Sequence, residues 1–131
     1  MILSAAGDGL ATMNLNHLHL HVRSTARSMT FYGRHFGLRE HVRHGEVVFM
    51  RDESGMDLAL APAAEADVMP PWFHFGFRLE TPAAVEALHA ALAADGAAIA
   101  EPLTYEADMV SFRCRDPDGY LIEVYWEVQP G

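Results

Sequence analysis

Three segments of the chain alternate between polar and apolar residues. Residues 17–22 read His-Leu-His-Leu-His-Val, and similar alternation runs through residues 72–79 and 121–127. Successive side chains of a strand point to opposite faces of a sheet. One face of each segment is apolar and suits a core, whereas the other carries histidine, arginine, glutamate and tyrosine. The pattern predicts three strands of half-buried sheets.

Two further segments carry apolar residues at helical spacing. The first runs from Ser24, a candidate N-cap, to about Phe36, and Gly37 is a candidate stop signal. The second begins at Thr81-Pro82 and ends at Gly96. The apolar stripe of the second helix is Val85, Leu88 and Leu92. Each predicted helix directly follows one of the alternating segments.

The chain contains an internal repeat. Residues 51–60 and 115–124 both read Arg-Asp-x-x-Gly followed by a strand-like segment, and each follows a short apolar run. Such turns close β-hairpins, because glycine accepts a positive φ. The order strand, helix, two or three strands therefore occurs twice, which predicts a pseudo-symmetric pair of modules.

The repeat also divides the chain. Module one covers about residues 14–61, a proline-containing linker covers 62–71, and module two covers about 72–128. Residues 1–12 are small and mixed, and we expect a tail there.

Aligning the two modules brings candidate metal ligands to equivalent positions. His17 falls on His74, and Ala59 falls on Glu123. Two imidazoles and one carboxylate leave coordination positions open for water and substrate. This ligand set suits non-haem Fe(II), and also Mn, Zn or Ni. The alternative is a polar interior whose members satisfy one another in a binding protein without metal.

Composition narrows the classes of partner and compartment. The 131 residues carry a formal net charge of −9, and all nine basic residues are arginine, so nucleic acid is not expected as a partner. The single cysteine, Cys114, excludes an internal disulfide and a Cys-based zinc site. No signal peptide and no apolar stretch of about 20 residues is evident, so we expect a cytoplasmic protein without a membrane span.

Four segments resemble those of one known superfamily: NHLHLHV, RSMTFYGRHFGL, PWFHFGF and DPDGYLIEVYWE. With them the chain resembles the vicinal oxygen chelate superfamily, which includes glyoxalase I, extradiol dioxygenases, fosfomycin-resistance enzymes and bleomycin-resistance proteins. The resemblance covers roughly residues 14–128. It implies an α+β fold in which two βαβββ modules form a cup-shaped incomplete barrel, as a single domain over residues 13–131. The metal positions of the superfamily match His17, His74 and Glu123.

Three more polar residues are candidates for catalysis. His19 shares the cup face with His17 and is a substrate contact, a proton shuttle or a hydrogen-bonded wall residue. Tyr125 either donates to a bound oxyanion or serves as a wall aromatic. Arg113 stands where extradiol and fosfomycin enzymes usually have a tyrosine. It either binds a carboxylate, enolate or phosphonate of the substrate or forms an ion pair with a cup carboxylate.

Three residues are candidates for substrate binding: Phe49, Trp72 and Arg78. The two aromatic side chains suit a flat substrate, and Arg78 has the same alternatives as Arg113. His21 lies too far along its strand from His17 to bind the same ion. The remaining histidines are expected at the surface: His35, His41, His44 and His89.

The resemblance implies a metal-dependent enzyme for a small substrate that chelates through adjacent oxygens. We expect an extradiol-type dioxygenase that uses Fe(II) on a catechol-like compound. The alternatives are an isomerase, lyase or transferase of the glyoxalase or fosfomycin kind, and a non-catalytic protein that sequesters a drug or metabolite. A homodimer is also expected from the resemblance, and the triad belongs either to one chain or to two.

Overall fold

The structure is a computed structural model that describes residues 11–129. The elements of the first half are β1 (His17–Val22), α1 (Thr25–Phe36), β2 (Arg39–His44), β3 (Val47–Arg51) and β4 (Asp57–Pro62). Those of the second half are β5 (Phe75–Arg78), α2 (Pro82–Ala94), β6 (Ile99–Tyr105), β7 (Met109–Arg115) and β8 (Leu121–Glu127). The predicted tail lies almost wholly outside the described residues.

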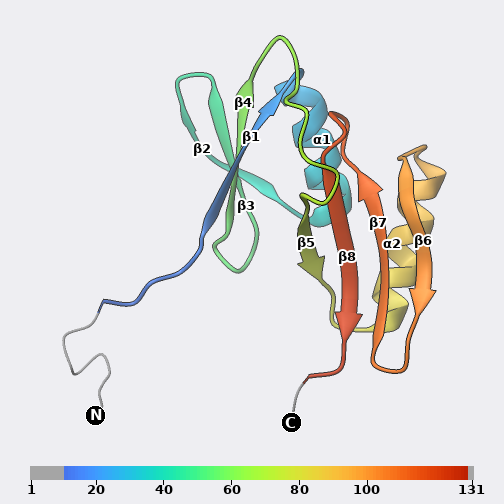
Figure 1. The fold of residues 1–131 in the computed structure, drawn as a ribbon. Helices are drawn as coiled ribbons and strands as arrows, with labels where there is room; N and C mark the ends of the chain where they lie inside the picture. The colour runs from blue at the N-terminus through green and yellow to red at the C-terminus, as the bar shows by residue number, and fades with distance from the viewer. Residues whose placement is uncertain (1–10, 130–131) are drawn as a thin grey trace.

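The strands form two separate open sheets of identical topology (Figure 1). The order is β1-β4-β3-β2 in the first and β5-β8-β7-β6 in the second. In each sheet the opening strand pairs in parallel with the last strand, and the other pairs are antiparallel. The predicted α+β fold with two βαβββ modules is confirmed. No helix among the described residues is long and apolar enough to cross a membrane.

Both helices begin and end as their sequences predict. The Ser24 hydroxyl accepts a hydrogen bond from the backbone of Arg27, and the Thr81 hydroxyl accepts one from Ala84. Gly37 ends α1 with a φ of 68°, a left-handed conformation that favours glycine. The caps therefore set where each opening strand turns into its helix.

The apolar strand faces and the helices share one core. Its fully buried members include Val22, Leu60, Phe112, Ile122 and Val124, so residues of both modules contribute. Phe36 of α1 stacks on Phe77 of β5, with ring centroids 4.3 Å apart. The polar faces of the two sheets consequently point away from this shared core.

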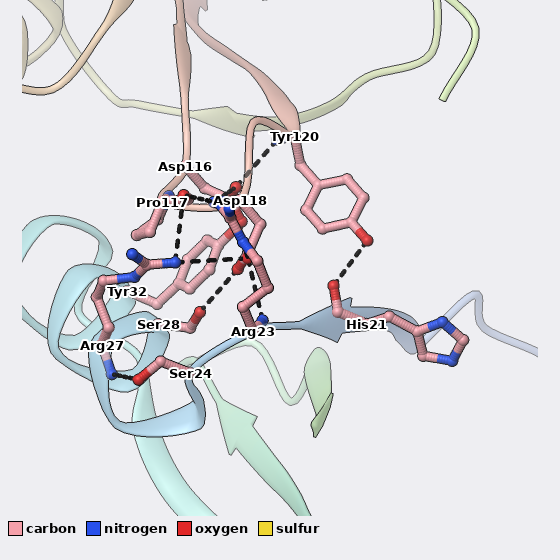
Figure 2. A network of polar contacts seen from close by, with 10 residues as sticks. All are labelled: His21, Arg23, Ser24, Arg27, Ser28, Tyr32, Asp116, Pro117, Asp118 and Tyr120. Carbon is pink, nitrogen blue, oxygen red and sulfur yellow. Dashed lines mark hydrogen bonds and ion pairs between the residues drawn. The ribbon is translucent and has the colours of Figure 1, made fainter. Parts of the chain in front are cut away.

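A polar network ties α1 to the β7–β8 turn (Figure 2). The buried Asp116 carboxylate accepts hydrogen bonds from the Tyr32 hydroxyl at 2.7 Å and from two backbone N–H groups of its own turn. The adjacent Asp118 carboxylate accepts from the Arg23 backbone and guanidinium and from Ser28. The two modules are therefore held in one fixed relation by hydrogen bonds as well as by the core.

Two sequence-based expectations are wrong at this level. The alternating segment 72–79 forms a strand only over Phe75–Arg78, because Trp72 lies in a turn after Pro70-Pro71. His35 is not a surface residue. Its side chain is 6% exposed, and Nε2 lies 2.9 Å from the Asp95 carboxylate at the end of α2.

Candidate functional site

The polar face of the second sheet brings His74, Arg113 and Glu123 together. Nε2 of His74 lies 3.7 Å from one carboxylate oxygen of Glu123, and a guanidinium nitrogen of Arg113 lies 3.7 Å from the other. The Glu123 side chain is 24% exposed. Among the described residues this carboxylate accepts no hydrogen bond. A half-buried carboxylate that has ion-pair neighbours but accepts no hydrogen bond keeps its oxygen lone pairs available to a cation.

A glycine lies directly against the backbone of Glu123. Gly76 pairs in register with Glu123, across β5 and β8. A Cβ atom at Gly76 would lie 3.1 Å from the Glu123 carbonyl oxygen and 3.8 Å from the Tyr125 ring. Any larger residue would crowd the strand that carries Glu123.

In two histidines, a hydrogen bond at Nδ1 leaves the lone pair of Nε2 available to a metal ion. Nδ1 of His74 lies 3.0 Å from the carbonyl oxygen of Trp72, which only accepts, so Nδ1 carries the proton. Nδ1 of His17 lies 3.0 Å from the side-chain oxygen of Asn16. A hydrogen bond of this kind fixes the ring of a metal-binding histidine and leaves the other nitrogen for the metal.

The polar face of the first sheet is rich in histidine. His17, His19 and His21 are all exposed on β1, as alternation predicts. His21 and Asp67 form a pair at 2.6 Å, and Asp67 comes from the loop between the modules. Sequence reasoning missed Asp67, since nothing in the loop's pattern relates it to a strand 46 residues away.

Other charged residues on these faces are already paired. Arg51 donates two hydrogen bonds to Asp57, which lower the pKa of that carboxyl. Arg78 binds the carboxylate and backbone carbonyl of Glu127 and lies 5.9 Å from the Tyr125 ring centre. Of the two roles expected for Arg78, substrate binding and an ion pair with a carboxylate of the cup, the structure shows the ion pair.

The apolar candidates differ in their surroundings. Phe49 lies on β3, half-buried, with its ring edge against His44. Trp72 is 72% exposed in the turn before β5.

The single cysteine of the chain is not a candidate nucleophile. Burial raises the pKa of the Cys114 thiol to about 12, so the reactive thiolate does not form at neutral pH.

The predicted triad is not assembled within one chain. His74 and Glu123 are neighbours, but the described residues contain no group of three His, Cys, Asp or Glu side chains arranged to hold a metal ion. His17 lies on the other sheet. The assignment of His17, His74 and Glu123 as metal ligands stays a prediction, as do the roles of the other site residues.

Comparison with known proteins identifies the family. The sequence profile of the Glyoxalase/Bleomycin resistance protein/Dioxygenase superfamily matches residues 14–124. The chain belongs to this superfamily. Among solved structures, a possible glyoxalase from Bacillus cereus is 32% identical, with a TM-score of 0.75 over 86% of this chain and 98% of that one.

Other superfamily structures share the fold at lower identity. A fosfomycin resistance protein from Listeria monocytogenes is 16% identical, with a TM-score of 0.77 over 90% of this chain and 96% of that one. A glyoxalase/dioxygenase from Nostoc punctiforme is 19% identical, with a TM-score of 0.71 over 98% of both chains. The comparison with curated proteins gives no significant match. The superfamily includes enzymes and binding proteins, so the reaction has to be argued from the site.

Proposed function

We propose that the protein is a metal-dependent enzyme whose site is completed by a second copy of the chain. His74 and Glu123 of one protomer and His17 of its partner would hold a divalent ion. The observation that carries this proposal is the Glu123 carboxylate, which lies between His74 and Arg113 without a hydrogen bond among the described residues. The free Nε2 atoms of His74 and His17 supply the other two donors.

Charge supports pairing between unlike halves of two chains. Module one, residues 14–61, holds six arginines and five acidic residues, a net charge of +1. Module two, residues 72–128, holds three arginines and ten acidic residues, a net charge of −7. The polar face of the first sheet is lined by histidines, and that of the second carries Glu123 and Glu127. Two copies related by a twofold axis would place each histidine-rich face against a glutamate-containing face.

Within this class we propose extradiol-type dioxygenation of a catechol-like substrate, with Fe(II) as the favoured metal. Two imidazoles and one carboxylate form the ligand set of non-haem Fe(II) oxygenases. The ion would supply a Lewis acid for adjacent substrate oxygens and a binding position for O₂. Phe49 would pack on a flat substrate, His19 would exchange a proton with a substrate hydroxyl, and the Tyr125 hydroxyl would donate to a substrate oxygen.

The first test is elemental analysis of protein purified without added metal and without oxygen. We expect about one metal ion per chain, with a large loss in His74→Ala. Iron supports the dioxygenase and leads to O₂ uptake assays with catechols, whereas Mn, Zn or Ni supports an isomerase, lyase or transferase. Absence of metal after reconstitution with each ion contradicts the enzyme and leaves a binding protein for a small molecule.

A mixing experiment tests whether the triad crosses chains. His17→Ala and Glu123→Ala each remove one ligand, and a mixed dimer of the two retains one complete site. Co-refolding equal amounts should restore about a quarter of the wild-type metal content, because half of the dimers are mixed and one of their two sites is intact. A triad within one chain predicts no restoration. Co-refolding His17→Ala with His17→Ala is the control.

A further inference from the structure

We infer that Arg113 is the anion-binding group of this site and that the substrate carries a carboxylate beside its chelating oxygens. The inference rests on the proposed function, because it concerns a ligand of the metal-loaded site. It begins from the contacts of one side chain. Arg113 pairs in register with Glu123 across β7 and β8, and its side chain is 24% exposed.

The guanidinium of Arg113 has donors to spare. It forms ion pairs with Glu123 at 3.7 Å and with Glu101 at 3.6 Å, and both distances are too long for a hydrogen bond. Two other arginines on these faces donate hydrogen bonds to a carboxylate. Arg51 bonds Asp57 at 2.7 and 2.9 Å, and Arg78 bonds Glu127 at 3.0 Å. The half-buried guanidinium group of Arg113 therefore donates no hydrogen bond to any of the described residues.

Metal binding would increase the need for an anion here. Glu123 is the shared neighbour of Arg113 and the proposed ion, so its single negative charge would face two cations. Glu101 lies on β6 with a side chain that is 60% exposed, where solvent screens its charge. An incoming carboxylate would restore the balance, and it would accept two parallel N–H bonds from the fork of Arg113.

Geometry then limits where the substrate carries its acid. Arg113 is the direct cross-strand neighbour of a proposed metal ligand, so the acid group has to lie close to the chelating oxygens. A small aromatic acid with adjacent hydroxyls meets both conditions. The predicted substrate class is therefore a dihydroxybenzoate-like compound rather than a neutral catechol.

The test compares ligands that differ only in the acid group. Protein loaded with Zn(II), which does not turn over with O₂, is titrated calorimetrically with catechol, 2,3-dihydroxybenzoate and 3,4-dihydroxybenzoate. We expect at least one acid to bind about tenfold tighter than catechol, the scale of one charge-assisted contact. Arg113→Met should abolish that advantage and leave catechol affinity within about threefold, and Arg113→Lys should retain part of it. Arg34→Met, on the exposed surface of α1, is the matched control.

The outcomes separate the two proposals. Equal binding of catechol and both acids to the wild type, or an acid preference that survives in Arg113→Met, overturns the inference and leaves the metal-dependent function intact. If the wild type does not bind zinc, or if the zinc-loaded protein binds none of the three compounds, the result contradicts both the proposed function and the role of Arg113. Metal content and thermal unfolding of each variant, measured beside the titrations, exclude a folding defect as the cause.

Discussion

The buried hydroxyl of Tyr32 donates to the buried carboxylate of Asp116 and so joins the two modules (Figure 2). Burial raises the pKa of Tyr32 well above its ordinary value, and the adjacent Asp116 charge raises it further. Burial also raises the pKa of Asp116, although hydrogen bonds from Tyr32 and the turn backbone oppose the shift. Removing either partner leaves a buried polar group unsatisfied.

Tyr32→Phe should therefore lower the free energy of unfolding by about 1–3 kcal/mol, the cost of a buried acceptor without its donor. Urea denaturation at neutral pH measures this change. Tyr105→Phe is the matched control, since Tyr105 also bonds a carboxylate, that of Glu86, but is 59% exposed. The control should change stability by less than about 0.5 kcal/mol. Equal effects of the two substitutions would contradict the role of burial.

Asp116→Asn should change the pH dependence of stability. Because burial raises the folded-state pKa of Asp116, the folded chain binds more protons than the unfolded chain between the two pKa values. The contribution of this group is fully present below the unfolded pKa and is lost as pH rises through the folded pKa. Asparagine does not titrate, so the variant should gain stability relative to the wild type as pH rises. Urea unfolding at several pH values from about 3.5 to 7 measures the difference, and a constant difference would refute it.

Single residues were predictable where the repeat relates them. Aligning the modules selected His17, His74 and Glu123, and the structure places only His74 and Glu123 near each other, at 3.7 Å, while their role as metal ligands stays a prediction. Asp67 and the buried His35 were not predictable, because their partners lie 46 and 60 residues away with no shared period. Contacts of this kind depend on how loops and helix ends meet in space.

At the scale of elements, two glycines on different elements should respond to alanine in opposite ways. Gly33 lies within α1, and a Cβ there meets its nearest atom at 3.4 Å, so Gly33→Ala should stabilise the protein by about 0.5–1 kcal/mol. Gly76→Ala brings a Cβ to 3.1 Å from the backbone oxygen of Glu123 in β8. It should destabilise the protein by about 1–3 kcal/mol and weaken metal binding about tenfold, because the carboxylate is displaced.

Thermal unfolding and metal titration of the two variants measure these effects. Gly33→Ala is also the control for metal affinity, which it should leave unchanged. Metal binding by Gly76→Ala at wild-type strength would contradict a metal position beside Gly76.

Elements with end signals were well predicted from the sequence. The caps Ser24 and Thr81 and the stop Gly37 mark the helices correctly, because each satisfies backbone groups locally. The start of β5 was misplaced, since its alternation continues back into a turn. Periodicity records which side chains face the core, but it does not record where backbone pairing with β8 begins.

At the scale of the whole molecule, the division of charge along the chain predicts salt-sensitive association. If module one, with a net charge of +1, faces module two of a partner, with a net charge of −7, raising the salt concentration should weaken the proposed dimer. Analytical ultracentrifugation at 50 and 500 mM NaCl should show a dissociation constant that rises at least about threefold. A constant that is unchanged or falls would indicate an interface held by apolar contacts instead.

The repeated order of elements was predictable, but the relation between the modules was not. Each module signals its own strands and helix through local pattern, and both patterns allow either of two module arrangements. The decision lies in contacts such as Phe36 with Phe77 and Tyr32 with Asp116, which join distant segments. The structure directs the two polar faces away from the shared core, and the proposed completion of the triad by a second chain starts from this arrangement.

The link between Tyr32 and Asp116 also has a consequence during synthesis. The two residues are 84 positions apart, so α1 leaves the ribosome long before the turn that accepts its hydroxyl exists. At about 5–20 residues per second, the interval is about 4 to 17 seconds. During that time the tyrosine and the neighbouring apolar surface of the first module have no partner from their own chain. The nascent first module is therefore the stage at which this protein is most open to chaperones and to premature association with other chains.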